Sequence, residues 1–411
     1  MGKRILILCD AFDAPAYAPR VRYLCENLVK MGWKPFLFTE KLVNVDYQIT
    51  CCPNVQIPYL VHKGWLGKIE WMLKVLLDDL FDCKSKYYYK CLKPIVKEKK
   101  FDVIFCSTFN LFPLGVAYKA ANEFYKPLCV DLRDVAEQWV HHEYYAHKMH
   151  FLPEKLNLLI NNLHKRRIIA RRNVCLRKAD ALTTISPWHV QFLKRINPNV
   201  FLIYNGFDER NFCFKLKKQE TFDIVYTGRL YDVSLRNPYL LLEAIRLLHE
   251  NNLLASDFRV RFFIDKLGQS TMKIQFEKYG IQQYAQFNDY IPPQEIPQLL
   301  RSASVILVLA NKTTENGPFG IMTTKFFEAL GVEKPILCVR SDESCLADAI
   351  RETNAGLAAT NVEEVKAFIL EKYEEWKRNG YTHQQVNVEK KQLFSRQFQA
   401  KQFVQIFEKC L

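Results

Sequence analysis

A lysine and a glutamate three residues apart, Lys325 and Glu328, are the residues of this chain whose types and spacing most clearly suggest chemistry. They follow a continuous apolar run at 303–310 and a polar segment at 311–319. This order predicts a buried parallel strand, then a loop, then a helix. On that helix the two side chains would share one face close to its N-terminus.

A helix N-terminus favours bound phosphate, because its backbone N–H groups and its dipole both attract negative charge. The pair would therefore suit a nucleoside diphosphate. Lys325 could neutralise phosphate charge, and the Glu328 carboxylate could accept hydrogen bonds from both ribose hydroxyls. The alternative is an ordinary i,i+3 salt bridge on a helix surface.

Length and composition indicate a globular protein of two domains. The chain has 411 residues, of which 49% are hydrophobic and 25% charged, and a single core seldom grows to that size. No run of about 18 uncharged apolar residues occurs, and the sequence passes from Met1-Gly2-Lys3-Arg4 directly into an apolar strand at 5–9. We therefore expect a cytoplasmic protein.

The cysteine pattern predicts reduced thiols rather than disulfides or a metal site. Thirteen cysteines are scattered singly, apart from Cys51-Cys52, and none forms a C-x-x-C pair. The glycine-rich dinucleotide fingerprint is also absent, since the first expected turn, 10–15, contains no glycine. We expect no metal and no nicotinamide or flavin cofactor.

The formal net charge of +14 is unevenly distributed. Between Lys148 and Lys178, nine lysines and arginines stand against Glu154 alone, a net charge of +8, which predicts attraction to phosphates. The segment 64–100 interleaves lysines with aromatic residues, namely Trp65, Trp71, Tyr87, Tyr88 and Tyr89. Such a mixture favours peripheral contact with an anionic membrane. Solvated helices whose aromatic side chains pack inward are the alternative, and no nucleic-acid-binding module is recognisable.

Strand and helix patterns alternate along the chain and predict two doubly wound parallel sheets. In the first half, strands are expected at 5–9, 33–39, 101–107, 127–131, 181–186 and 200–204, with helical stretches at 20–31, 66–98 and 114–123 and up to residue 178. The alternation restarts at 223–227. We expect an N-terminal Rossmann-like domain at 1–200, a C-terminal Rossmann-like domain at 201–395, and a helix at 396–411 that crosses back to the first domain. Ligands of such sheets bind in a cleft at the carboxyl ends of the strands.

Five segments in this order resemble the glycosyltransferases of the GT-B fold, and among them the retaining family 4 enzymes that use nucleotide-sugars. They are Val130-Asp131-Leu132-Arg133-Asp134, Ala179 to Ser186, Tyr204-Asn205-Gly206-Phe207-Asp208, Tyr226-Thr227-Gly228-Arg229-Leu230, and Lys325 to Glu328 with Gly331 and Pro335. The resemblance spans almost the whole chain, and it implies that 1–200 is the acceptor domain and 201–395 the nucleotide-sugar domain. It implies transfer of a sugar from a nucleotide-diphospho-sugar to an acceptor hydroxyl, with retention and without a metal.

The resemblance also assigns roles to individual residues. Gly228 and Arg229 follow a strand, and the Arg229 guanidinium would hold the diphosphate, with Arg236 as the one candidate for the second cation that the family places nearby. Asn205 and Gly206 would form a turn beside the nucleotide, where the glycine supplies an unusual φ.

On the acceptor side, the resemblance points to the segment after the strand at 127–131. Asp131, Arg133 and Asp134 would face the acceptor and the reacting sugar, where a carboxylate could orient or deprotonate the acceptor hydroxyl. A structural salt-bridge cluster of these three residues is the alternative.

One departure from the family pattern concerns the donor sugar. The family has a glutamate eight positions before the residue equivalent to Glu328, and this chain has Gly320 there. Contacts to the sugar would then come from the backbone and hydroxyls of 317–324, including Thr323 and Thr324. A similar abbreviated pattern occurs in bacterial surface-polysaccharide transferases, which suggests a lipid-linked or saccharide acceptor at the inner face of the cell membrane. Two alternatives stay open, a nucleotide-sugar epimerase or hydrolase of the same fold and a catalytically silent nucleotide-sugar-binding subunit.

Overall fold

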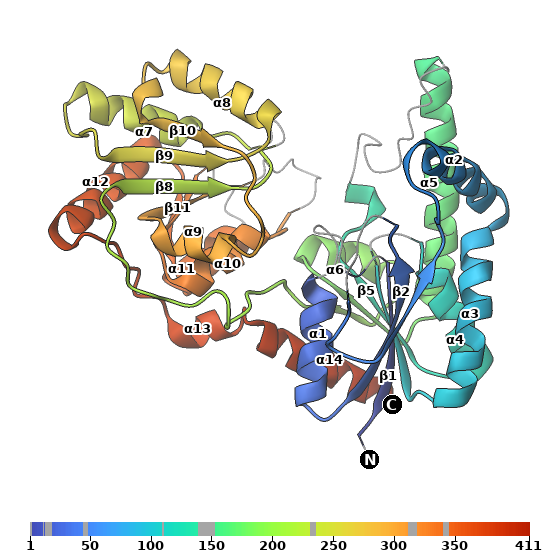
Figure 1. Ribbon diagram of the computed structural model, residues 1–411. Coiled ribbons are helices and arrows are strands. Elements are labelled where there is room, and N and C mark those ends of the chain that lie inside the picture. The colour runs from blue at the N-terminus through green and yellow to red at the C-terminus, as the bar shows by residue number, and fades with distance from the viewer. Residues whose placement is uncertain are drawn as a thin grey trace. The chain divides into compact units, whose positions relative to one another are not determined.

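The computed structural model describes residues 2–10, 12, 19–43, 48–108, 111–138, 153–230, 236–310, 319–339 and 345–411. The chain divides into two compact units, each built on its own parallel sheet (Figure 1). Unit 1 consists of residues 1–204 and 399–411, and unit 2 consists of residues 205–398.

The sheet of unit 1 has seven parallel strands in the order β3-β2-β1-β4-β5-β6-β7. The strands are β1 Arg4–Cys9, β2 Lys34–Lys41, β3 Asn54–Pro58, β4 Val103–Thr108, β5 Leu128–Leu132, β6 Ala181–Thr184 and β7 Val200–Leu202. The helices are α1 Pro19–Lys30, α2 Gly64–Phe81, α3 Cys83–Lys99, α4 Leu114–Phe124, α5 Glu154–Arg177, α6 Pro187–Lys194, the 3-10 turn Ala136–Gln138, and most of α14 Arg396–Cys410.

Successive side chains of each strand point to opposite sides of this sheet. Helices cover both sides, so each side contributes to its own apolar core. Leu6 and Leu8 of β1 face a core formed with α3, α4, α5 and α6. Ile5 and Ile7 face a second core, formed with α1 and with Phe403 and other apolar residues of α14. The C-terminal helix is thus part of the packing of unit 1 (Figure 1).

Two local features of unit 1 differ from the sequence prediction. The helical stretch predicted at 66–98 is two helices, because Asp82 adopts a left-handed conformation with φ 56° between α2 and α3. The edge strand β3 was not predicted; its short, half-buried sequence lacks the apolar run of the central strands.

The aromatic residues of the segment 64–100 divide between the core and the surface. Tyr88 and Tyr89 of α3 are buried in the core, whereas Trp65 and Trp71 of α2 are exposed.

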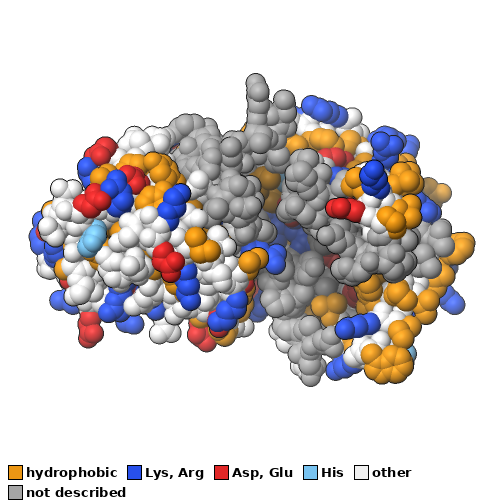
Figure 2. All heavy atoms as spheres, turned by 90° about the horizontal axis from the view of Figure 1, so that it is seen from above, with side chains coloured by type: hydrophobic (Ala, Val, Ile, Leu, Met, Phe, Trp, Pro, Cys, Tyr) orange, Lys and Arg blue, Asp and Glu red, His pale blue; other side chains and the backbone are white. Residues whose placement is uncertain are grey.

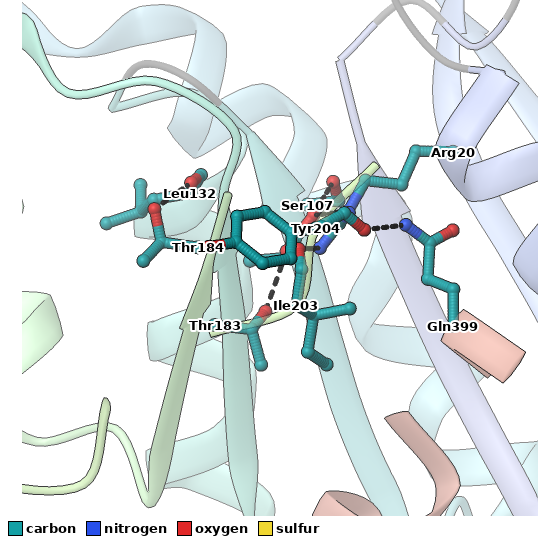
Figure 3. Close-up of polar contacts among 9 residues, drawn as sticks. Arg20, Ser107, Leu132, Thr183, Thr184, Ile203, Tyr204 and Gln399 are labelled. Atoms are coloured by element: carbon teal, nitrogen blue, oxygen red, sulfur yellow. Dashed lines mark hydrogen bonds and ion pairs between the residues drawn. The ribbon is translucent and has the colours of Figure 1, made fainter. Parts of the chain in front are cut away.

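A buried ion pair joins helix α1 to the end of β5 in unit 1 (Figure 3). The Arg20 guanidinium donates to both oxygens of the Asp131 carboxylate, at 3.0 and 2.9 Å. The same carboxylate accepts hydrogen bonds from the hydroxyls of Ser107 on β4 and Thr183 on β6, at 3.0 and 2.7 Å. The side chains of Arg20 and Asp131 are 3% and 0% exposed, so this carboxylate is fully satisfied and shielded from solvent.

The remaining donors of this network fix the segment that follows β7. Arg20 donates to the carbonyl oxygens of Ile203 and Tyr204, at 2.9 and 3.0 Å. Gln399 of α14 donates to the Tyr204 carbonyl at 2.6 Å, and Figure 3 shows these groups converging on the strand end. Because buried carbonyls need partners, this network anchors the last residues of unit 1 before the chain enters unit 2.

The sheet of unit 2 has six parallel strands in the order β10-β9-β8-β11-β12-β13. The strands are β8 Phe222–Thr227, β9 Phe258–Phe263, β10 Ala285–Asn288, β11 Val305–Leu309, β12 Ile336–Val339 and β13 Gly356–Ala359. The helices are α7 Tyr239–Glu250, α8 Lys266–Lys278, α9 Ile296–Ser302, α10 Thr324–Val332, α11 Cys345–Glu352, α12 Val362–Asn379, α13 Val388–Gln392 and the 3-10 turn Gln282–Tyr284.

Helices also cover both faces of the second sheet (Figure 1). Apolar residues of α7, α8 and α12 form one large core with β8 and β9, while α9, α10 and α11 lie on the opposite face. This arrangement confirms the predicted class, a protein of two doubly wound parallel sheets. No helix among the described residues is long and apolar enough to cross a membrane.

We expect Asp131→Asn to lower the free energy of unfolding by about 3–5 kcal/mol, because it leaves the buried Arg20 guanidinium without its counter-charge. The measurement is urea unfolding of the full chain followed by circular dichroism. Glu26→Gln is the control, since it breaks the more exposed Arg22–Glu26 pair of the same helix and should change stability by less than about 1 kcal/mol. Wild-type stability in Asp131→Asn would contradict the structural role.

Candidate functional site

Unit 2 contains a pocket at the carboxyl edge of its sheet, where β8 ends and α10 begins. Its volume is about 170 Å³. Its lining comes from the ends of β8 and β9, the segment after β10 and the first turns of α9 and α10: Thr227, Gly228, Phe263, Tyr290, Ile291, Ile296, Thr324, Lys325 and Glu328. This is the edge at which open parallel sheets bind ligands.

Helix α10 brings Lys325 and Glu328 into the pocket together. Thr323 is its N-cap, and the hydroxyl accepts a hydrogen bond from the backbone N–H of Lys325 at 3.4 Å. Phe326 and Phe327, between the two polar residues, are buried and fix the orientation of the helix. The three-residue spacing therefore places the ammonium and the carboxylate on the face that lines the pocket.

Gly228 allows Lys325 to lie directly across the end of β8. Its φ is +96°, in the region that favours glycine. A Cβ atom at this position would lie 2.8 Å from Cε and 2.9 Å from Nζ of Lys325. The Lys325 ammonium also lies 5.6 Å from the centre of the Tyr226 ring, a cation–π distance. Any side chain at 228 would displace the lysine.

The charged forms of Lys325 and Glu328 are poorly solvated. The pKa of Lys325 is lowered to about 8, mainly by burial and also by the charge of Arg236, while Glu328 opposes the change. Burial raises the pKa of Glu328 to about 7, against the effects of Lys325 and Arg396. Among the described residues, neither Lys325 nor Glu328 has an ion-pair partner within 4.0 Å. Titratable groups whose pKa values are shifted in this way, and which lie together in a pocket, mark a candidate binding site.

Two arginines lie close to this pocket without lining it. The Arg229 side chain is 64% exposed, and its Nε lies 4.0 Å from the Asp265 carboxylate. Arg236 donates to the Arg229 carbonyl oxygen at 2.6 Å and is near enough to Lys325 to affect its pKa. The predicted cations Arg229 and Lys325 are thus neighbours in the structure, and Arg236 lies with them.

The structure gives Gly206 a different role from the predicted one. Its φ is not among the positive values of the described glycines, so an unusual φ does not explain it. Instead, a Cβ atom there would lie 2.4 Å from the Phe394 carbonyl oxygen. The next residue, Phe207, pairs with Ser395 as an isolated parallel bridge. Asn205 and Gly206 therefore belong to a strand-like contact with 394–395, and neither lines the pocket.

The other predicted donor residues lie at the start of α10. Gly320 is buried and has φ +68°, which favours glycine at this position. Thr324 lines the pocket and Thr323 caps the helix. Most of the predicted polar loop 311–319, including Gly317, lies outside the described residues.

The predicted catalytic residues of unit 1 do not act as one cluster. Asp131 is engaged by Arg20, Ser107 and Thr183 in the sheet, and no oxygen of this buried group is open to a substrate. Its environment is that of a structural residue, so we leave Asp131 out of the proposed catalytic groups. The predicted salt bridges with Arg133 and Asp134 are replaced by the pair with Arg20.

Arg133 and Asp134 lie at the carboxyl edge of the unit 1 sheet and have separate partners. Arg133 donates to both oxygens of Asp10, at 2.8 and 3.0 Å, directly after β1. Burial raises the pKa of Asp10 to about 6, although Arg133 opposes the shift. Asp134 accepts a hydrogen bond from the Gln138 side chain at 2.8 Å, and burial raises its pKa.

Gln138 continues this chain of contacts to His189, which the sequence did not single out. The Gln138 Oε1 atom lies 2.6 Å from Nε2 of His189. Burial lowers the pKa of His189 to about 4, so the ring is neutral at pH 7 and donates through Nε2. Sequence reasoning also missed the pocket residue Tyr290, whose hydroxyl donates to Asp265 at 3.2 Å. Its position just after β10 was the available signal.

The sequence of unit 2 matches a known family. Residues 208–390 match the family described as glycosyl transferases group 1. The match lies within unit 2 and covers somewhat less than half of the 411 residues. A comparison with curated protein sequences gives no match.

Solved structures resemble the whole chain. Sucrose-phosphate synthase from Thermosynechococcus elongatus has a TM-score of 0.62 at 14% identity, over 99% of each chain. A glycosyltransferase from Rickettsia africae has a TM-score of 0.61 at 13% identity, over 100% of this chain and 98% of that one. The Anabaena protein HepE, in complex with UDP and glucose, has a TM-score of 0.56 at 14% identity, over 99% of this chain and all of its own. These likenesses confirm the predicted GT-B fold.

We expect Glu328→Gln to raise the stability of the ligand-free protein at pH 8 by about 1–3 kcal/mol, because it removes a carboxylate whose pKa is raised from 4.5 to about 7. Between pH 4.5 and 7 the folded state binds more protons than the unfolded state, so this carboxylate lowers stability as pH rises. The gain should therefore shrink toward pH 5. Thermal unfolding at both pH values measures it, with the exposed Glu277→Gln as control. Equal stability of wild type and Glu328→Gln at pH 8 would contradict the burial argument.

Proposed function

Because residues 208–390 match the glycosyl transferases group 1 family, we propose that this protein transfers a sugar from a nucleoside-diphospho-sugar to an acceptor hydroxyl. The observation that carries the proposal is the pocket of unit 2, where Lys325 and Glu328 lie at a helix N-terminus with no ion-pair partner among the described residues. A buried charge without a partner destabilises the free protein. A ligand that supplies phosphate and hydroxyl groups would satisfy both residues.

The pocket offers complementary groups to each part of the donor. Lys325, Arg229 and Arg236 would hold the diphosphate, aided by the backbone N–H groups at the start of α10. The Glu328 carboxylate would accept hydrogen bonds from the ribose hydroxyls. Phosphate charge next to Lys325 would raise its pKa again, and so keep the ammonium protonated at neutral pH.

The same cations would serve the reaction itself. Negative charge develops on the diphosphate as the bond to the sugar breaks, and preorganised cations at that position stabilise it more in the transition state than in the ground state. We propose that Lys325 and the arginines fulfil this role without a metal ion or a cofactor. Retention of the anomeric configuration is part of the proposal and rests on the family resemblance.

On the acceptor side, the candidates are Arg133 and Asp134 at the carboxyl edge of the unit 1 sheet. Burial raises the pKa of Asp134, which would make its carboxylate a stronger base toward an acceptor hydroxyl. Gln138 and the neutral His189 would orient this carboxyl group through their hydrogen bonds.

We further propose that the acceptor is lipid-linked or a saccharide, and that unit 1 reaches it at the cytoplasmic face of a membrane. Helix α2 exposes a series of large apolar side chains, namely Trp65, Leu66, Ile69, Trp71, Met72, Leu73, Leu77 and Phe81. The first half of α5 adds four exposed leucines at 156, 158, 159 and 163. In Figure 2, which views the molecule from above, apolar and basic side chains lie next to one another on unit 1. Apolar and basic groups together favour an anionic bilayer surface.

The donor proposal predicts that one nucleoside diphosphate raises the unfolding temperature. UDP is the first candidate, followed by GDP, CDP and ADP, with NAD as a negative control. At about 100 times its dissociation constant the ligand should add about 2.7 kcal/mol. Glu328→Gln and Lys325→Gln should abolish the shift, whereas Glu277→Gln should retain it. A shift with NAD alone, or with no nucleotide, would overturn the proposal.

Turnover of the matching nucleotide-sugar then separates the three functions. Release of the nucleoside diphosphate only when an acceptor is present indicates a transferase. Conversion of the donor without an acceptor would indicate the epimerase or hydrolase alternative. Binding without any turnover would leave the silent subunit as the function.

The membrane proposal predicts flotation of the protein with vesicles that contain phosphatidylglycerol, and weaker flotation at high salt because ions screen the attraction. Trp65→Glu with Met72→Glu should abolish flotation, since both side chains are more than half exposed on α2. Leu267→Glu, in which an exposed apolar residue of unit 2 is replaced, should leave it unchanged. Equal flotation of both variants would exclude α2 as the contact.

A further inference from the structure

Three cysteine sulfurs meet beneath the edge of the unit 1 sheet. The Sγ atoms of Cys25, Cys51 and Cys52 all lie within 4.8 Å of one another, and those of Cys51 and Cys52 are 3.9 Å apart. Among the described residues, this is the only group of three potential metal ligands at such distances. The group lies outside the proposed sugar-transfer machinery and does not depend on it.

The distances suit coordination of one metal ion. Zinc lies about 2.3 Å from thiolate sulfur, so two sulfurs of a tetrahedral site are about 3.8 Å apart. The observed 3.9 Å between Cys51 and Cys52 meets this requirement, and the Cys25 sulfur lies within 4.8 Å of both. Small rotations of the side chains would bring all three sulfurs to bonding distance.

The surrounding structure holds the three residues in place before any ion binds. Cys25 is on α1 and is fully buried, and Cys52 is 8% exposed in the same apolar core. The loop that carries Cys51 and Cys52 is held by Asn54, whose side chain donates to the carbonyl oxygens of Ile49 and Cys52 at 2.9 and 3.0 Å. Cys51 is only half-buried, which provides a path for an ion and room for a water as fourth ligand.

Binding of the ion would release protons from the cluster, because the thiolate is the form of cysteine that ligates a metal.

We propose that Cys25, Cys51 and Cys52 form a binding site for a thiophilic d10 cation, with Zn²⁺ as the ion that fits a three-thiolate, one-water site. The ion would tie α1 to the loop before β3. Helix α1 also carries Arg20, which anchors the strand ends through Asp131. The site would therefore stabilise unit 1 rather than take part in catalysis.

The test uses the whole 411-residue chain, reduced, stripped with a chelator and titrated with Zn²⁺ against a chromophoric competitor. We expect about one tightly bound Zn²⁺ per chain, and a thiolate-to-metal charge-transfer band when Co²⁺ replaces it. Cys51→Ser with Cys52→Ser should lose both signals. Cys91→Ser, a half-buried cysteine of α3, should keep them. Binding that is absent from the wild type, or unchanged in the double variant, would overturn the proposal.

A second measurement needs no variant. Alkylation of the wild-type protein with iodoacetamide, mapped by mass spectrometry, should modify Cys51 in the stripped protein and spare it after Zn²⁺ is added. The half-buried Cys91 and Cys345 should react equally in both states. Equal labelling of Cys51 with and without Zn²⁺ would show that the sulfurs are merely packed thiols.

Discussion

The buried pair of Arg20 and Asp131 is the interaction on which unit 1 depends. It links helix α1 to the middle of the sheet, and through Ser107 and Thr183 it reaches the strands on either side. The same guanidinium holds the carbonyls of Ile203 and Tyr204. Because a buried charge is stable only when it is paired and hydrogen-bonded, these elements must assemble together.

The Arg20–Asp131 pair differs from Lys325 and Glu328 in how fully its groups are engaged within the protein. Both sets combine a cation and a carboxylate near the carboxyl edge of a parallel sheet. In unit 1 every oxygen of Asp131 is engaged, and no substrate could compete for it. In unit 2 the two groups share a pocket, neither forms an ion pair with another residue that the structure describes, and their pKa values move toward neutrality. Such groups mark a candidate binding site for a ligand.

Sequence periodicity was sufficient to predict the two sheets and the pocket pair, because each rests on local rules. Buried parallel strands read as apolar runs, and a spacing of three fixes a helix face. The buried surroundings of Asp131 could not be predicted, because its partner Arg20 lies 111 residues away and nothing in the local sequence reveals that contact. The same limit applies to Cys25, whose approach to Cys51 and Cys52 depends on how α1 packs. Tyr290 could have been found from the strand that precedes it.

The glycines show why residue type alone could not decide these roles. Gly228 and Gly206 both fit a motif, yet Gly228 makes room for a lysine side chain whereas Gly206 makes room for the backbone at 394. Gly331 has a third reason, since a Cβ there would lie 2.7 Å from Cβ of Phe212. Only the first of these places a charge in a pocket. Gly228 therefore has two reasons to be glycine, since its φ of +96° suits no other residue type well and the absent Cβ leaves space for the Lys325 ammonium.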